Sequence, residues 1–221
     1  LCSLMGVSQI NITFQLAPEV EILNYQKLIM SLLDQWPHGL RLMIILKNIK
    51  LSQRHLKMNN ISFIGMAGCG KSTLGKAFSD KHNLNFVDTD NLIESEYNMT
   101  LEHVKKKFGY KFVRSAEEKA ILGLDKTSQI ISTGGSAVYS SISMNHLMSF
   151  SKVIYIDTPL DVVIERIGVG QERGLAVPEG MTIAEVFEER KPLYEKFSQS
   201  SIDGSKAIED LIILIENIIN E

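Results

Sequence analysis

Apolar and polar positions along residues 58–221 follow two alternating patterns. Short runs rich in β-branched and aromatic residues, typical of strands, occupy residues 61–65, 84–88, 129–133 and 152–156, with a shorter candidate at 200–203. Longer segments between these runs space their apolar residues as helices do. Because strands that alternate with helices form parallel sheets covered on both faces, the pattern predicts an α/β fold.

Two helix starts carry capping signals. Thr158 precedes Pro159, which predicts a cap followed by proline at the first helical position. Thr182 and Glu185 stand three residues apart and match a capping box. We therefore expect one helix to begin after each threonine.

Residues 1–57 lack this regular alternation. Residues 20–36 predict an amphipathic helix that ends at Pro37 and Gly39. The sequence begins with Leu1, and the regular pattern starts directly after Met58. We expect a catalytic domain over residues 58–221 and an N-terminal extension of unknown role over residues 1–57. We interpret the extension as dispensable, and the alternative is a packed regulatory segment.

The amino-acid composition limits which binding partners and which cellular compartment we expect for the protein. Hydrophobic residues make up 44% of the chain and charged residues 22%, as in an ordinary globular protein. A formal net charge of -3 provides no basic surface for nucleic acid or an anionic membrane. The apolar runs are too short to span a bilayer, and no signal peptide is visible. Two cysteines without a CxxC pair fit a reducing compartment. We expect a cytoplasmic monomer with a small-molecule substrate.

A glycine-rich loop follows the first predicted strand. Gly65, Gly70, Lys71 and Ser72 fit the pattern G-x-x-x-x-G-K-[ST], and a helical segment follows them. Glycines let the backbone amides surround an anion, and the helix N-terminus adds partial positive charge. The motif assigns Lys71 to the β- and γ-phosphates and Ser72 to Mg²⁺. We interpret Cys69 as a small residue tolerated in this loop, and the alternative is a thiol of lowered pKa.

Two carboxylates follow the second predicted strand. Asp88 and Asp90 are two residues apart, so on a strand they would point in the same direction. At the carboxyl end of a parallel strand they would face the ligand crevice. One could hold hydrated Mg²⁺ and the other an acceptor hydroxyl. The alternative is a pair of turn and cap residues before the next helix.

These motifs, in this order, resemble the shikimate kinase family from Met58 to about Asn217. The sequence has a phosphate loop, then DTD, a glycine pair after the third strand, and RKPLY near the end. The resemblance implies a three-layer α/β/α P-loop NTPase fold of the nucleoside-monophosphate-kinase type. It also implies a five-stranded parallel sheet and a mobile lid at about residues 168–181. The implied reaction is ATP-dependent phosphorylation of a hydroxyl on a cyclic carboxylic acid.

The resemblance also assigns roles to single residues. Asp90 would bind the substrate hydroxyls and act as the candidate base, Asp88 would associate with Mg²⁺, and Arg173 would reach the transferring phosphate from the lid. Implied contacts to ATP come from Gly65, Gly68, Gly70, Lys71, Ser72, Thr73, Arg166 and Arg173. Implied contacts to the acceptor come from Asp90, Arg114, Glu117, Gly134, Gly135 and Arg190. In this assignment Glu117 positions Arg114 from one helical turn away.

The chain departs from the usual family pattern at the acceptor end and in the lid. Ser136, Tyr110 and Gly174 stand where the family usually has glycine, glutamate and proline. Two alternatives therefore stay open: a kinase for another hydroxy acid such as gluconate, and a non-catalytic nucleotide-binding regulatory protein. The presence of every expected charged residue of the site argues against the second alternative.

Overall fold

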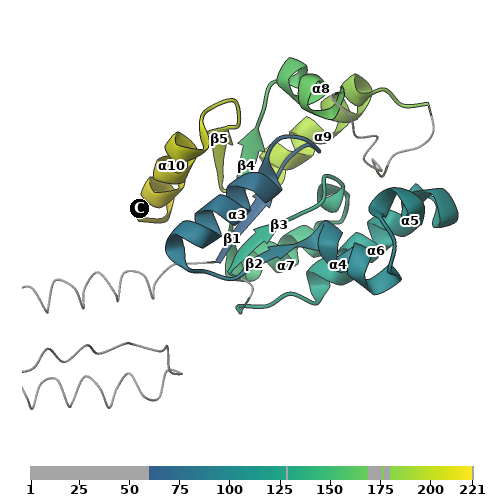
Figure 1. The fold of residues 1–221 in the computed structure, drawn as a ribbon, viewed down its shortest axis with the longest axis horizontal. Helices are drawn as coiled ribbons and strands as arrows, with labels where there is room; N and C mark the ends of the chain where they lie inside the picture. The colour runs from purple at the N-terminus through teal and green to yellow at the C-terminus, as the bar shows by residue number, and fades with distance from the viewer. Residues whose placement is uncertain (1–59, 128, 169–175, 177–179, 221) are drawn as a thin grey trace, which may run out of the picture. The chain divides into compact units, whose positions relative to one another are not determined.

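The structure, a computed structural model, describes residues 60–127, 129–168, 176 and 180–220 (Figure 1). Residues Met58–Glu221 form one compact unit. The N-terminal extension with its predicted helix, Arg173 and most of the predicted lid lie outside the described residues.

Five parallel strands form one sheet in the order β2-β3-β1-β4-β5. The strands are β1 (Asn60–Ile64), β2 (Phe86–Asp88), β3 (Ile130–Ser132), β4 (Ser151–Asp157) and β5 (Ser200–Asp203). Every residue of β1 is buried, as expected for a central strand with both faces covered. The predicted α/β fold and its five-stranded parallel sheet, including the short last strand, are confirmed.

Helices cover both faces of the sheet and make the three-layer arrangement (Figure 1). α3 (Lys71–His82) and α10 (Ile208–Asn220) lie side by side on one face. α7 (Ser141–Phe150) and α9 (Ile183–Phe197) pack against β4 on the other, and α8 (Leu160–Gly168) packs on α9. Among the described helices, none has the length and apolar content that a bilayer crossing requires.

Three further helices form a group that continues from the carboxyl end of β2. They are α4 (Thr89–Tyr97), α5 (Leu101–Phe108) and α6 (Tyr110–Leu122), and each contacts the other two. Val104 and Val113 form the buried centre of the group, with Tyr97, Met99, Leu101 and Phe112 packed around them. This group has an apolar centre of its own beside the main core, and it supplies one wall of the site described below.

One of the two predicted helix caps is confirmed, and the other is wrong. Thr182 and Glu185 form the capping box at the start of α9, with both reciprocal hydrogen bonds present. Thr158, by contrast, donates its hydroxyl to the Cys69 carbonyl at 3.3 Å, and α8 begins at Leu160. Thr158 is fully buried beside the glycine-rich loop, and no amide of the described residues donates to its hydroxyl oxygen, so the side chain makes a tertiary contact and no helix cap.

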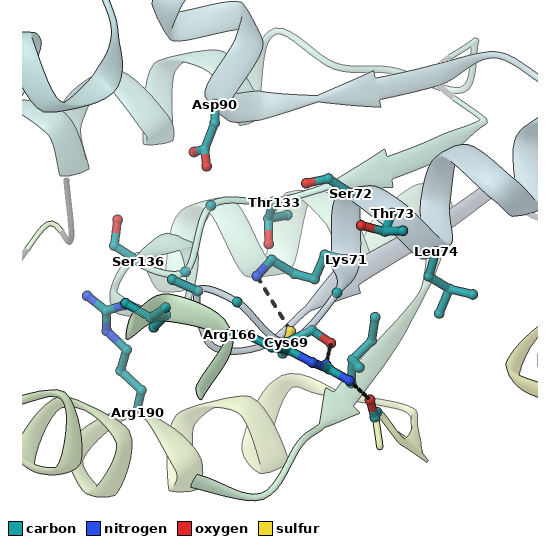
Figure 2. Close-up of a pocket in the computed structure, with 18 of the residues that line it drawn as sticks. Cys69, Lys71, Ser72, Thr73, Leu74, Asp90, Thr133, Ser136, Arg166 and Arg190 are labelled. Carbon is teal, nitrogen blue, oxygen red and sulfur yellow. Dashed lines mark hydrogen bonds between the residues drawn. The ribbon is translucent and has the colours of Figure 1, made fainter. Parts of the chain in front are cut away.

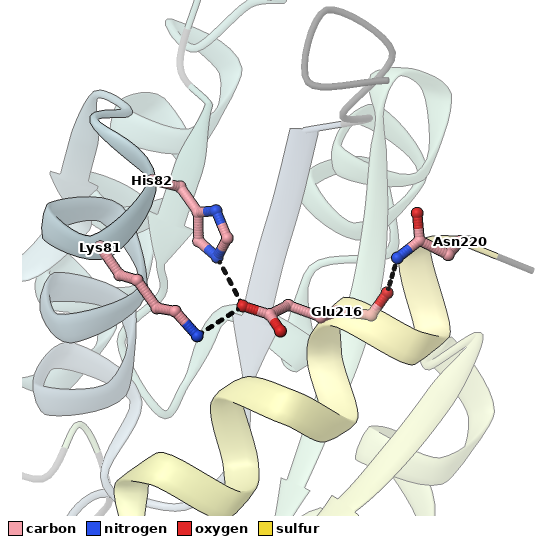
Figure 3. Close-up of polar contacts among 4 residues, drawn as sticks. All are labelled: Lys81, His82, Glu216 and Asn220. Atoms are coloured by element: carbon pink, nitrogen blue, oxygen red, sulfur yellow. Dashed lines mark hydrogen bonds and ion pairs between the residues drawn. The ribbon is translucent and has the colours of Figure 1, made fainter. Parts of the chain in front are cut away.

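An ion-pair cluster joins α3 to α10 (Figure 3). The Glu216 carboxylate on α10 accepts from Lys81 Nζ at 2.7 Å and lies 3.0 Å from His82 Nε2, both at the end of α3. Asn220 donates to the backbone carbonyl of Glu216 at 2.5 Å. The hydrogen bond from Lys81 holds the pKa of Glu216 below its ordinary value. The ionised carboxylate therefore ties the two helices together.

Replacing Glu216 by glutamine should lower the free energy of unfolding at pH 7 by about 0.5 kcal/mol, the usual size for a partly exposed ion pair. The pKa of Glu216 is lower in the folded chain, so this stabilisation exists above the ordinary pKa of 4.5 and is lost as the pH falls below it. Urea unfolding of wild type and Glu216→Gln at pH 7 and pH 3 measures both effects. Equal stabilities at pH 7 would show that the cluster contributes nothing.

Candidate active site

A cavity of about 600 Å³ opens at the carboxyl ends of the strands, where ligands bind in parallel α/β sheets. Residues that follow β1, β2, β3 and β5 line it, together with side chains from α6, α8 and α9. In the view of Figure 2, Asp90, Ser136 and Arg190 gather on one side of Lys71, and Leu74 lies on the other. The cavity therefore has two ends with the glycine-rich loop between them.

The glycine-rich loop has a backbone that suits an anion. Gly65, Gly68 and Gly70 have φ values of 147°, 80° and 104°, which side-chain-bearing residues rarely adopt. Gly70 is the N-cap of α3, and it has no side chain to satisfy the first amides of that helix. Unsatisfied amides at a helix N-terminus attract anions such as phosphate. The predicted phosphate loop therefore has the required local geometry.

Lys71 is held inside this loop. Its side chain is buried, and Nζ donates to the carbonyls of Gly65 and Met66, both at 2.9 Å. Nζ also lies 3.7 Å from Cys69 Sγ. Ser72 and Thr73 are exposed and line the cavity beside it. The structure thus brings an ammonium group and two hydroxyls together at the centre of the cavity.

Asp88 and Asp90 make different contacts, because the strand alternation assumed in the sequence prediction does not extend to Asp90. The strand ends at Asp88, and α4 begins at Thr89, so helical geometry replaces the alternation of a strand. Asp88 Oδ1 accepts from the Asp90 amide at 3.0 Å and caps α4. Asp90 lines the cavity, and Asp88 does not. The turn-and-cap interpretation therefore holds for Asp88, while Asp90 is placed to contact a ligand.

The glycine pair after β3 allows two carboxylates to approach the backbone closely. A Cβ added to Gly134 would lie 2.5 Å from both Asp90 Oδ1 and Glu117 Oε1, so a side chain there would force the two carboxylates to move. The Gly134 amide donates to Thr89 Oγ1 at 2.9 Å. A Cβ on Gly135 would lie 3.0 Å from Arg190 Nη1. Both glycines therefore set the spacing among the charged groups of the site.

Glu117 is fully buried among these charges. The Ser136 hydroxyl donates to Oε2, and Oε1 has no hydrogen-bond partner within the described residues. Burial, reinforced by the Asp90 carboxylate, raises the pKa of Glu117 to about 7, although Ser136, Arg190 and Lys71 oppose the shift. The Glu117 carboxyl group is thus partly protonated at neutral pH.

The predicted arginine pair converges on one backbone carbonyl. The Ala176 oxygen accepts from Arg114 Nε at 3.0 Å and from Arg190 Nη2 at 3.4 Å. Arg190 is buried and lines the cavity, whereas Arg114 is half-buried and does not line it. The described residues contain no ion pair between Arg114 and Glu117, so the structure gives no support to the interpretation that Glu117 positions Arg114.

The other end of the cavity contains Arg166, which was expected from the sequence, together with residues that were not expected. Arg166 Nη1 donates to the Cys69 carbonyl at 3.4 Å, and Nη2 donates to the Gly204 carbonyl at 3.2 Å. Gly204 packs against Thr158, and a side chain at this position would collide with its hydroxyl. Ile167, Lys206, Ile208 and Leu211 complete this wall. The glycine directly after the predicted last strand was the available sequence signal for this turn.

Mg²⁺ would have oxygen ligands at this site. The described residues contain no cluster of three or more His, Cys, Asp or Glu side chains, so a cage built from these residues is absent there. Mg²⁺ usually keeps several waters and binds one or two carboxylates together with substrate phosphates. The exposed Ser72 hydroxyl in the cavity fits that set directly. Asp88 keeps one oxygen beyond its helix cap, and because it does not line the cavity it fits as a ligand acting through water.

The fold and the cavity define a P-loop phosphotransferase. A glycine-rich loop follows the central strand, a carboxylate follows β2, and the buried Arg190 lines the same cavity. The chain belongs to the shikimate kinase family, whose family model matches residues 67–220.

Individual relatives agree with this family membership. The chain is 30% identical to the shikimate kinase of Sulfurihydrogenibium sp. over 164 residues, which cover 72% of this chain and 99% of the relative. It is 36% identical to the shikimate kinase of Persephonella marina over 138 residues, which cover 62% of this chain and 84% of the relative.

Solved structures of the family have the same fold. The shikimate kinase of Aquifex aeolicus superposes with a TM-score of 0.62 at 26% identity, covering 72% of this chain and 94% of the other. The shikimate kinase of Acinetobacter baumannii, solved in complex with shikimate, superposes with a TM-score of 0.65 at 24% identity. The match covers 73% of this chain and 93% of the other.

Replacing Glu117 by glutamine should change how stability depends on pH. The pKa of Glu117 is raised in the folded chain, so the folded state keeps a proton that the unfolded state loses above pH 4.5. The contribution of Glu117 to the free energy of unfolding therefore falls as the pH rises from about 4.5 to about 7. Urea unfolding at pH 5 and pH 7.5 should show a smaller decline in Glu117→Gln than in wild type. Ser136→Ala, which removes a hydrogen bond to the ionised form, should extend the decline to higher pH. Parallel pH profiles in wild type and Glu117→Gln would contradict the raised pKa.

Proposed function

We propose that this protein transfers the γ-phosphate of ATP to a hydroxyl of shikimate and gives shikimate 3-phosphate and ADP. One observation carries the proposal beyond family membership: a single cavity joins the phosphate loop around Lys71 to an acceptor end that holds Asp90 and the buried Arg190. A phosphate donor and a carboxylated hydroxyl compound would each find complementary groups there. The same family membership favours shikimate over the alternative acceptor, gluconate.

ATP would bind along the glycine-rich loop. Its phosphates would accept from the loop amides and the first turn of α3, with Lys71 between the β- and γ-phosphates. Arg166 and the turn at Gly204 form the wall that we assign to the base of the nucleotide. Arg173 remains a proposed lid residue that reaches the transferring phosphate.

Shikimate would bind at the opposite end. Planar carboxylates are best held by guanidinium groups, which offer paired N–H donors. Arg190 and Arg114 already meet at one acceptor atom, so a carboxylate there could accept from both. The close approach of Gly134 to Asp90 leaves backbone rather than side chain beside the hydroxyl. The ring would thus be held at its carboxylate and its hydroxyl at the same time.

Transfer then requires positioning and neutralised charge more than covalent assistance. The hydroxyl oxygen forms a bond to the γ-phosphorus, the bond between that phosphorus and the bridging oxygen of ADP breaks, and the hydroxyl proton passes to Asp90. Lys71 balances charge on the transferring group. Mg²⁺, held by Ser72 and through water by Asp88, would supply additional charge neutralisation on the phosphates.

Three features of the chain remain predictions: a dispensable extension that ends before Met58, a monomeric state and a cytoplasmic location. None of them is needed for the proposed reaction.

A coupled assay of ADP release across a panel of hydroxy acids tests the proposal. We expect shikimate to give a kcat/KM at least about 100-fold above that of gluconate, because polar groups of the site would be left unpaired by the wrong acceptor. Lys71→Ala should lower kcat about 1,000-fold by removing the cation at the transferring phosphate. Turnover with gluconate alone, or no loss in Lys71→Ala, would refute the assignment.

Substitutions of Asp88 and Asp90 should affect the Mg²⁺ dependence of the activity differently. Asp90→Asn should lower kcat about 1,000-fold with little effect on ATP affinity, because an amide cannot accept the hydroxyl proton. Asp88→Asn should raise the Mg²⁺ concentration needed for half-maximal rate and retain the cap of α4, since asparagine also caps helices. Separate titrations of Mg²⁺ and shikimate distinguish these results. Rescue of Asp90→Asn by excess Mg²⁺, without rescue of Asp88→Asn, would reverse the two roles.

A further inference from the structure

We infer that Tyr139 is a positioning residue that orients both arginines of the acceptor end toward a carboxylate, an inference that rests on the proposed function. Tyr139 is the last residue of the short 3-10 helix η1 (Ala137–Tyr139), which follows the glycine pair. None of the motifs in the sequence includes it.

Tyr139 contacts both guanidinium groups with different parts of its side chain. The Arg114 Cζ atom lies 3.7 Å from the centre of the ring, the distance of a stacked pair. The Arg190 Cζ atom lies 5.2 Å from the same centre, and Arg190 Nε donates to the Tyr139 hydroxyl at 3.3 Å. One side chain therefore provides the flat face for one arginine and a hydrogen-bond acceptor for the other.

The charges around the pair explain why such a residue is needed. Two guanidinium groups that share an acceptor repel each other, and neither forms an ion pair with a carboxylate of the described residues. Glu117 lies near Arg190 but is partly protonated at neutral pH, so it compensates the charge incompletely. The π face of an aromatic ring attracts a cation without adding negative charge. Tyr139 thus keeps two cations together and leaves their positive charge for a ligand.

The hydrogen bonds of Arg114 show what remains for that ligand. Its Nε atom is used by the Ala176 carbonyl, while within the described part of the chain its two Nη groups donate no hydrogen bond. Stacking on Tyr139 restricts the plane of the guanidinium group and hence the direction of these donors. Tyr110 also lies near this group, 5.2 Å from Cζ, but no contact joins it to Arg190 among the described residues. Tyr139 is the tyrosine that links the two arginines.

The segment from Gly134 to Tyr139 contacts every charged side chain of the acceptor end. Gly134 abuts Asp90 and Glu117, Gly135 abuts Arg190, and Ser136 bonds to Glu117. Tyr139 adds Arg114 to this set. A change in the ring should therefore alter recognition of the acceptor and leave the phosphate loop in place.

The test compares an acidic acceptor with a neutral one. Binding of shikimate and of shikimate methyl ester is measured by titration calorimetry, and KM is measured for both acceptors and for ATP. Tyr139→Leu should raise Kd and KM for shikimate about tenfold, as expected for a desolvated cation–π contact, and should change those for the ester and for ATP less than about twofold. Tyr139→Phe retains the ring and should raise the shikimate values about threefold through the lost hydroxyl. Phe150→Leu, an aromatic-to-leucine change at a half-buried residue of α7 that packs on His146 and does not line the cavity, should leave all the values unchanged.

Each outcome decides the inference. Equal losses for shikimate and its ester, or a comparable rise in KM for ATP, would assign Tyr139 a general packing role and overturn it. If Tyr139→Leu fails to fold, Tyr139→Phe decides, and an unchanged ratio of acid to ester affinity would overturn the inference. A wild-type protein that neither binds nor phosphorylates shikimate would refute the proposed function, and the inference would fall with it. A wild type that does both, with the ratio unchanged in the variants, would overturn the inference alone.

Discussion

Parallel pairing of β1 with β3 and β4 is the constraint on which the site depends. Parallel strands end at the same edge of a sheet, so the loops after β1, β2 and β3 meet there although they are far apart in the sequence. The order of the strands in the sheet therefore determines where the ligand-binding groups lie. Phosphate-binding amides follow the central strand, a carboxylate follows β2, and the glycine pair lies between them after β3. A slip of one residue in this pairing would separate the groups that the reaction has to bring together.

The acceptor end concentrates like charges in pairs. Asp90 and Glu117 both abut Gly134, and Arg114 and Arg190 share the Ala176 carbonyl. Each pair would be unfavourable in isolation, and each is relieved by a different means. Partial protonation of Glu117 relieves the carboxylates, and an aromatic ring together with neutral oxygens relieves the guanidinium groups. Among the described residues, neither arginine of this pair forms an ion pair with a carboxylate, so their positive charge can act on a bound anion.

The order of elements could be predicted from sequence because it depends on local patterns. Runs of β-branched residues marked all five strands, and the glycine spacing marked the phosphate loop. Contacts between residues that the tertiary fold brings together could not be predicted from these local patterns. Thr158 looks like a helix cap in sequence but bonds to the loop that folds against it. The hydrogen-bond partner of Glu117 is a serine nineteen positions away, and Tyr139 has no motif to mark it. The hydrogen bond by which Asp88 caps α4 depends on the start of that helix, which the alternation of a strand could not show.

The carbonyl of Ala176 has a consequence for how an acidic ligand enters. It gives both arginines an acceptor within the protein itself, so the buried Arg190 is not left without a partner. A carboxylate that takes this place exchanges the hydrogen bonds from Arg114 Nε and Arg190 Nη2 for new ones, and the Nη groups of Arg114 offer it further donors. The net gain is the difference between a charged acceptor and a neutral one, which favours a full negative charge over an ester or an amide. Selectivity for an acid can therefore arise from competition with the protein's own backbone.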